Sequence, residues 1–359
     1  MDNGRARALI LSATEYHMPM LLKPHWMIVL LLALGVLLSG PVISGEEEAP
    51  SQVPPAVRAG INSALDYLAS RVRPDGSVTS NYSGIATSAL VGTAFLANGC
   101  APNRGKYGPQ LARITNYILS NSHETSGYIS SRGGDNMYAH GFATLFLAEV
   151  YGMSPDPRIE IALRKAVKLI EYSQGEHGGW RYYPRPSESD ISVTICQVMA
   201  LRAARTAGIP VDPDTIKRAT ECVKQGSNPD GGFSYIVGQG RSSSFPRSAA
   251  GVCILYYLGE YEAPEVKRGI EYIDAHIPSS PNAQRSSSHI MYGYYYAAQA
   301  MFQVGGDYWN RWYPDLCAWV LRNQYSDGSL NSSLGGDYAT AMAAIVMQIP
   351  YRYLPIFQR

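Results

Sequence analysis

The chain has 359 residues, of which 46% are apolar and 16% are charged, with 30 Lys and Arg against 29 Asp and Glu. This composition excludes a disordered chain and predicts a large apolar core. The net charge of +1 argues against binding to nucleic acid. Tyrosine is unusually common, at 26 residues against 7 Phe, so many rings are expected to have one edge in a polar place. The five dispersed cysteines predict buried thiols and no disulfide framework.

The first 45 residues are predicted to lie outside the folded domain. Lys23 precedes an apolar run at 26–38, and Pro41 and small residues follow the run. This order is typical of an export signal, and a membrane span needs about 20 apolar residues, more than this run offers. A retained membrane anchor is the alternative interpretation. Both interpretations predict an exported protein, in the periplasm, outside the cell or anchored to the membrane, and residues 46–53 are expected to form a linker.

A turn of the form Gly-x-apolar recurs about every fifty residues. It begins at Gly76, Gly127, Gly178, Gly231 and Gly328, with spacings of 51, 51, 53 and 97 residues. The last spacing is about two periods, so the missing copy is expected near 281–283, where its Gly has been lost. An Asp precedes the Gly in three of the copies, which is typical of a tight turn and predicts a structural role for those carboxylates.

Each turn separates two segments with different helical patterns. Segments with one apolar and one charged face are typical of surface helices and are expected at 57–72, 110–120, 158–173, 215–224, 264–276 and 309–323. Segments rich in Ala, Thr and Gly with few charges are typical of buried helices and are expected at 85–96, 139–150, 191–204, 248–258, 291–302 and 338–348.

Six pairs of one outer and one inner helix predict an all-α fold. The expected architecture is an α6/α6 toroid, a double-layered barrel of six helical hairpins over residues 54–349, followed by a C-terminal tail at 350–359. A linear solenoid is the competing architecture. Such a solenoid needs polar capping helices at both ends, and the last predicted helix is apolar, so the pattern favours a closed ring.

The third and sixth copies of the turn resemble the QW repeat of squalene and oxidosqualene cyclases. The residues that carry the resemblance are Gln174, Gly178 and Trp180, and again Gln324 and Gly328. On this basis residues 54–349 resemble the terpene cyclase/protein prenyltransferase superfamily of α/α toroids, in particular exported bacterial proteins with prenyltransferase and squalene oxidase repeats. The resemblance implies a structural role for these residues, with the Gln bonded to the backbone of the adjacent repeat.

The catalytic motifs of these families are incomplete in this chain. Squalene-type cyclases protonate an alkene with an Asp-x-Asp-Asp motif, and the corresponding segment here keeps only Asp190. Asp190 is therefore a candidate acid or, alternatively, the N-cap of a helix. Asp315-Leu316-Cys317 resembles the start of the prenyltransferase zinc motif, but no His follows it. We expect no metal and no other cofactor.

The N-termini of the inner helices are expected to converge at one end of the barrel and to form a polar pocket. His140 and Asp190, from adjacent inner helices, are the candidate acid–base pair. Residues 181–185 are expected to surround the opening. The candidate ligand-binding residues at this end are Tyr82, Tyr138, Arg247, His289, Tyr292 and Asp337.

Three functions are compatible with this pattern. The first is a toroid with degenerate catalytic motifs that binds a hydrophobic, peptide or glycan ligand. The second is a terpenoid cyclase or prenyltransferase that uses Asp190 as the acid. The third is an α/α-barrel enzyme acting on polysaccharide, which would need two facing carboxylates, with Asp190 and Asp337 as candidates.

Overall fold

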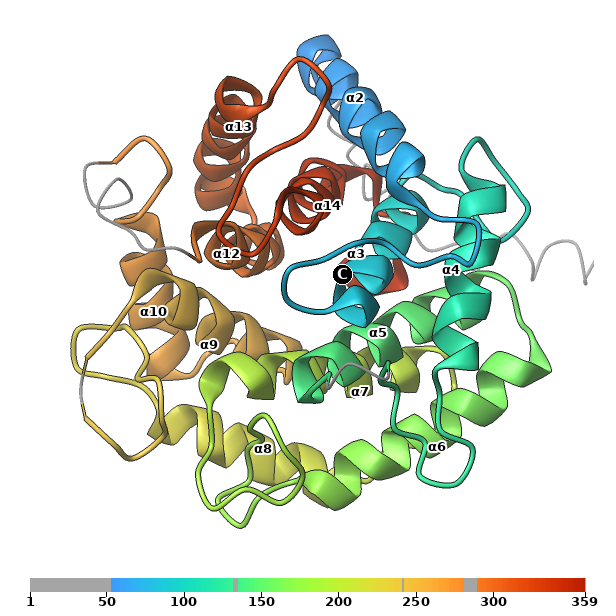
Figure 1. The fold of residues 1–359 in the computed structure, drawn as a ribbon. Coiled ribbons are helices and arrows are strands. Elements are labelled where there is room, and N and C mark those ends of the chain that lie inside the picture. Colours follow the sequence, from blue (N-terminus) through green and yellow to red (C-terminus); the bar gives the residue numbers. More distant parts are fainter. Residues whose placement is uncertain (1–52, 132–134, 241, 281–288, 359) are drawn as a thin grey trace, which may run out of the picture. The chain divides into compact units, whose positions relative to one another are not determined.

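The structure, a computed structural model, describes residues 53–131, 135–240, 242–280 and 289–358, all of which belong to one compact unit. Figure 1 shows two concentric layers of helices. The outer helices are α2 (Pro55–Arg71), α4 (Gly108–Ser120), α6 (Pro157–Ser173), α8 (Pro213–Gln225), α10 (Pro264–Asp274) and α13 (Gly306–Asn323). The inner helices are α3 (Gly84–Ala97), α5 (Met137–Met153), α7 (Ile191–Thr206), α9 (Phe245–Tyr257), α12 (Ile290–Val304) and α14 (Gly336–Met347).

Burial separates the two layers as the sequence pattern predicts. Inner helix α5 buries 13 of its 17 residues, whereas outer helix α6 buries 7 of 17 along one face. Small residues let the inner helices approach closely: a Cβ added at Gly92 of α3 would lie 2.4 Å from the ring of Phe146 in α5. Most outer helices carry Pro in the first turn, where the missing N–H has no helical acceptor and costs nothing.

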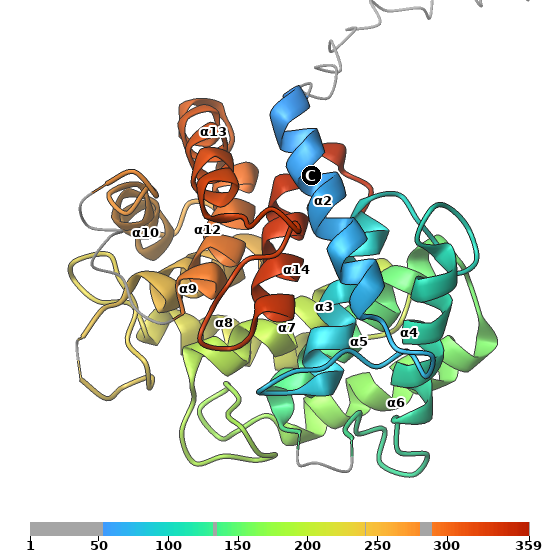
Figure 2. The ribbon, with the colours of Figure 1, turned by 45° about the horizontal axis from the view of Figure 1, so that its top comes forward.

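The ring is closed by contact between the last inner helix and the first. Helix α14 packs on α3, and both views show the two side by side (Figures 1 and 2). The side chain of Gln348, at the end of α14, donates to the carbonyl of Ala94 at 3.1 Å and accepts from Nδ2 of Asn98 at 2.9 Å. The predicted α6/α6 toroid is confirmed, and closure excludes the linear solenoid.

The repeated glycines allow each turn to lie against the next outer helix. Gly178 has a φ of 86°, a conformation that favours Gly, and a Cβ there would lie 2.3 Å from the carbonyl oxygen of Arg218 in α8. Gly328 has the same conformation and would meet the carbonyl oxygen of Ser63 in α2 at 2.2 Å. The sixth turn therefore packs on the first hairpin.

Two glutamines that lie four residues before a turn glycine bond successive hairpins together. Nε2 of Gln174 donates to the carbonyls of Gly178, at 2.7 Å, and of Thr215 in α8, at 2.9 Å. Nε2 of Gln324 donates in the same way to Gly328, at 2.9 Å, and to Gly60 in α2, at 3.0 Å.

Trp180 has a structural role within its own repeat. Its ring is fully buried, but Nε1 donates to the carbonyl of Ile170 at 2.9 Å, within its own repeat. The Gln therefore links neighbouring repeats, and the Trp fixes the turn to the helix that precedes it.

The C-terminal segment packs against the barrel. Two short 3-10 helices, η1 (Ile349–Tyr351) and η2 (Pro355–Phe357), follow α14, and η2 contacts α5 and α7. Leu354, Ile356 and Phe357 are buried. Because Pro355 lies beside Gly152 near the end of α5, this segment covers the end of the barrel opposite the inner-helix N-termini.

Some predictions fall on residues that the structure does not describe, namely the signal or anchor at 1–45, most of the linker and the turn at 281–283. Within the described part of the chain, none of the helices has the length and apolar character needed to span a bilayer. The five cysteines are all buried and free, as predicted.

Candidate ligand-binding cavity

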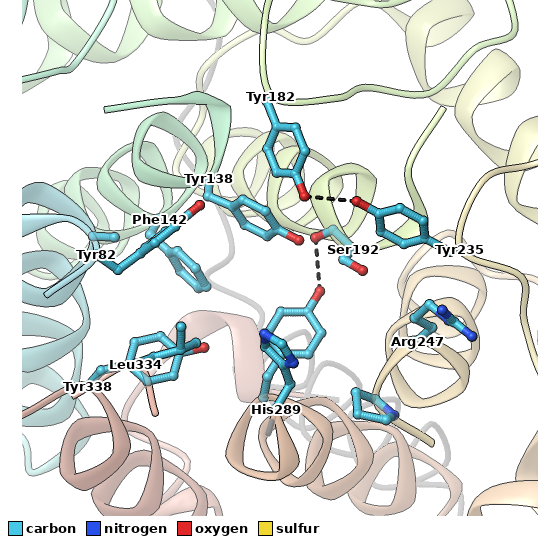
Figure 3. Close-up of a pocket in the computed structure, with 13 residues that line it drawn as sticks. Tyr82, Tyr138, Phe142, Tyr182, Ser192, Tyr235, Arg247, His289, Leu334 and Tyr338 are labelled. Atoms are coloured by element: carbon cyan, nitrogen blue, oxygen red, sulfur yellow. Dashed lines mark hydrogen bonds between the residues drawn. The ribbon is translucent and has the colours of Figure 1, made fainter. Parts of the chain in front are cut away.

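A cavity of about 390 Å³ lies at the N-terminal end of the inner helices. Every inner helix contributes a residue from its first two turns to the wall, and Figure 3 shows these side chains arranged around a common space. The lining residues are Tyr82, Ala86, Tyr138, Phe142, Tyr182, Ser192, Tyr235, Pro246, Arg247, His289, Tyr292, Leu334 and Tyr338.

Five of the six predicted ligand-binding residues lie on this wall: Tyr82, Tyr138, Arg247, His289 and Tyr292. Convergence of the inner helices at one end brings them together from positions up to 210 residues apart. Their role in binding stays a prediction.

Protein groups already bond several of the tyrosine hydroxyls in the wall. The hydroxyls of Tyr182 and Tyr235 lie 2.8 Å apart, and the Tyr292 hydroxyl donates to the carbonyl of Ser192 at 2.9 Å (Figure 3). Asn136 donates to the hydroxyl of Tyr82 at 2.9 Å. These rings consequently present mainly carbon to the cavity.

Five phenols of the wall are kept neutral by burial. In each of these five residues, burial is the main cause that raises the pKa of the phenol above its ordinary value of 10. The five are Tyr82, Tyr138, Tyr235, Tyr292 and Tyr338.

Asp190 lies behind the wall and is fully buried. It is the N-cap of α7, with Oδ1 accepting from the backbone N–H of Ser192 at 2.7 Å. Its Oδ2 has no hydrogen bond of good geometry within the described residues. The hydroxyl of Tyr235 lies near this carboxyl and acts to lower its pKa, in opposition to burial. Burial raises the pKa of this carboxyl above its ordinary value. Capping is therefore observed, and Asp190 itself does not line the cavity.

The predicted pairing of His140 with Asp190 is wrong. His140 is fully buried, its Nδ1 accepts from the backbone N–H of Ile129 at 3.1 Å, and its Nε2 lies 3.3 Å from the carbonyl of Ala166. Both ring nitrogens are thus used by the backbone, and burial lowers the pKa of His140 to about 4, so the ring is neutral. It does not line the cavity.

The role of His140 becomes clear from the equivalent positions of other repeats. In the five repeats whose turn is described, one inner-helix side chain accepts from the backbone N–H of the third turn residue. The pairs are Ser88 with Val78, His140 with Ile129, Thr194 with Trp180, Ser248 with Phe233, and Thr340 with Leu330. His140 is a structural member of this series.

Asp337 lies in a separate polar pocket of about 170 Å³ and not on the main cavity wall. Its carboxylate accepts from the Tyr67 hydroxyl at 2.8 Å and forms an ion pair with Arg71 at 3.2 Å. Leu334 and Tyr338 line both spaces and separate them. The charge of Asp337 is therefore balanced by Arg71, and Asp337 does not face Asp190 across the cavity.

Sequence reasoning missed several wall residues, among them Phe142, Tyr235, Leu334 and Tyr338. Phe142 follows Tyr138 by one helical turn, so helical periodicity could have identified it. Tyr235 and Leu334 come from loops whose paths no periodic pattern predicts. Tyr182, within the predicted 181–185 segment, does face the cavity.

No group of three or more His, Cys, Asp or Glu side chains within the described ranges is arranged to hold a metal ion. The Asp of the Asp-Leu-Cys sequence, Asp315, instead accepts from the backbone N–H of Ser279 at 2.8 Å.

Comparison with known proteins shows similarity at the level of the fold. No family model matches the sequence, and no curated protein matches it. A type II terpene cyclase, MstE from Scytonema, superposes with a TM-score of 0.60 at 12% identity, over 83% of this chain and 99% of that one. A protein from Actinoplanes superposes with a TM-score of 0.57 at 16% identity, over 83% and 99% of the chains.

A second class of enzyme has the same fold. An inactive variant of an α-1,6-mannanase from Salegentibacter, in complex with α-1,6-mannotriose, superposes with a TM-score of 0.62 at 8% identity, over 81% of this chain and 98% of that one. A variant of MstE in complex with its substrate, geranylgeranyl dihydroxybenzoate, superposes with a TM-score of 0.59 at 13% identity, over 82% of this chain and 97% of that one. The chain therefore has the α/α-toroid fold shared by terpene cyclases and mannanases, a fold that holds ligands of different chemistry.

Proposed function

We propose that this protein is a noncatalytic toroid that binds an elongated apolar ligand, of isoprenoid or acyl type, in the tyrosine-lined cavity. The observation that carries the proposal is the nature of the wall, which presents aromatic rings and, among the described residues, no carboxylate. Ring faces and aliphatic carbon stabilise an apolar chain by burial, at about 25 cal/mol per Å².

The alternatives find less support in the cavity. A polysaccharide-acting enzyme needs two carboxylates across its cleft, but Asp190 caps α7 and Asp337 is paired with Arg71. A glycan ligand also favours unoccupied hydrogen-bonding groups, whereas several wall hydroxyls are bonded to protein. The cyclase alternative retains one supporting observation, since the raised pKa of Asp190 favours its protonated form.

The test uses two ligands that separate these classes, geranylgeraniol and α-1,6-mannotriose, in equilibrium dialysis with the purified protein. We expect saturable 1:1 binding of geranylgeraniol and none of mannotriose. Ala86→Phe should weaken the binding of geranylgeraniol about tenfold or more, because the added ring occupies cavity volume that the ligand needs. Ala59→Phe, on the exposed face of α2, is the matched control and should bind as the unchanged protein does.

Binding of mannotriose alone, or equal affinity in both Phe variants, would contradict the proposal. Incubation with geranylgeranyl dihydroxybenzoate tests catalysis in the same protein. We expect the compound to be recovered unchanged; a cyclised product that disappears in Asp190→Asn would favour the cyclase alternative instead.

A further inference from the structure

The cavity contains a cation whose charge no wall residue balances. Arg247, in the first turn of α9, lies on the wall beside Tyr235, 5.9 Å from the centre of its ring. One Nη donates to the carbonyl of exposed Ser242 at 2.9 Å. Nε is buried and has no hydrogen-bond partner in the described chain.

The surroundings of Arg247 favour an anion. Burial is the main cause that lowers the pKa of Arg247, but an Arg still remains charged at neutral pH. Asp190, the carboxylate whose charge acts on Arg247, is already used as a helix cap behind the wall. A half-buried charge with no opposite charge bonded to it is costly to a fold, and an anionic ligand would offset that cost.

The start of α9 adds a second observation. Helices α3, α5 and α7 are capped by the side chains of Ser83, Asn136 and Asp190, whereas the starts of α9, α12 and α14 have no side-chain cap. Among the described residues, the backbone N–H groups of Phe245 and Arg247 therefore have no side-chain cap, and Pro246 between them carries no N–H. Orphan N–H groups and the helix dipole both favour a negative group at this place.

We propose that the ligand is an amphipathic acid, with a single anionic group bound by Arg247 at the start of α9 and an apolar chain extending toward Phe142 and Tyr292. This inference rests on the proposed function and specifies the class of its ligand. Phe142 and Tyr292 are buried and belong to the wall, so the chain lies deep and the acid lies near the opening.

The test compares two probes that differ only in their head group, geranylgeranoic acid and geranylgeraniol. We expect the acid to bind about 10- to 100-fold more tightly than the alcohol, since a hydrogen-bonded charge contributes about 1.5–3 kcal/mol. Arg247→Gln should remove this preference by weakening the acid alone, and Arg247→Lys should keep part of it. Arg164→Gln, which removes an exposed Arg of α6, is the control and should keep the full preference.

The outcomes separate the two levels of the proposal. Equal affinity for acid and alcohol, or an acid preference that survives in Arg247→Gln, overturns the anionic subsite and leaves the apolar cavity intact. Failure of both probes overturns the proposed function and the subsite together. Inorganic phosphate that competes fully with the acid shows an anion site that needs no apolar chain, and it also overturns the amphipathic ligand.

Folding of the variants is checked by thermal unfolding. Because Arg247→Gln removes a charge that lacks a partner, its melting temperature should equal or exceed that of the unchanged protein without ligand. A loss of acid binding in a variant with a lower melting temperature would instead indicate a structural role for Arg247 and would contradict the subsite.

Discussion

Glu149 is a buried acid without a counter-ion. It lies near the C-terminal end of α5, is 1% exposed, and receives a hydrogen bond from the backbone N–H of Ile356 in the C-terminal segment. Its Oε2 has no hydrogen-bond partner in the described ranges. Burial raises the pKa of this carboxyl to about 8, so the native protein keeps it protonated at neutral pH.

This pKa predicts a decline in stability with rising pH. Between pH 4.5 and 8 the native state binds a proton at Glu149 that the unfolded state has released, so the free energy of unfolding falls as the pH rises through this window. Glu149→Gln keeps an acceptor for Ile356 and removes the ionisation. We expect little effect at pH 5 and a gain of up to about 5 kcal/mol at pH 8.5, since the pKa rises from 4.5 to about 8 and one pKa unit corresponds to about 1.4 kcal/mol.

Chemical denaturation at the two pH values measures this difference. Glu176→Gln, at an exposed position, is the control and should show the same small effect at both. A gain for Glu149→Gln that does not depend on pH would show that Glu149 is not protonated in the native state.

For single residues, the sequence predicted where a side chain lies in the fold better than it predicted what the side chain does. It placed five of six ligand candidates on the cavity wall because the start of an inner helix is readable from its pattern. It could not distinguish a His that bonds two backbone groups, such as His140, from a His that faces a cavity, because both stand at the start of an inner helix. Tertiary hydrogen bonds decide between them.

The turns show how one repeated element sets the spacing of the hairpins. Gly178 combines a positive φ with close contact to the next outer helix, so an added Cβ meets both a backbone preference and the carbonyl of Arg218. Gly208, after α7, has a similar φ of 84° but has nothing within 4 Å of the added Cβ. Comparing substitutions at the two glycines therefore separates the free-energy cost of a positive φ from the cost of the close contact with α8.

We expect Gly208→Ala to lower the free energy of unfolding by about 1–2 kcal/mol, the usual cost of a left-handed residue with a Cβ. Gly178→Ala should cost at least about 2 kcal/mol more, because backbone in α8 must move or the turn must lift from it. Urea denaturation of both variants gives the comparison. Equal costs would mean that the turn and α8 are not in firm contact.

The elements themselves were predictable because each carries its own signal. All twelve predicted helices are found within the described residues, with differences of a few residues at their ends. The packing of the C-terminal segment was not predictable, because Ile356 and Phe357 are buried by α5 and α7, which lie far away in the sequence.

For the whole domain, closure of the ring makes the first and last hairpins neighbours. The contacts at the seam join residues about 250 positions apart: Gln348 with Ala94 and Asn98, and Gln324 with Gly60. No local feature of the sequence encodes this pairing; it follows from six hairpins that each turn by a similar angle until the last meets the first. The cavity depends on it, because α3 and α14 both contribute to the wall.

The seam predicts a coupling that an open array of hairpins would lack. Gln348 is fully buried, and its side chain bonds α14 to α3. Gln348→Leu keeps the bulk but leaves the Asn98 amide and the Ala94 carbonyl without their partner, at a cost of about 1–3 kcal/mol. Hydrogen exchange should therefore accelerate in α3 as much as in α14, although α3 lies about 250 residues from Gln348 in the chain.

Gln225→Leu, at the exposed end of α8, is the matched control and should leave the exchange rates of both helices unchanged. Faster exchange confined to α14 would mean that the last hairpin opens independently, and the ring would then not act as one cooperative unit.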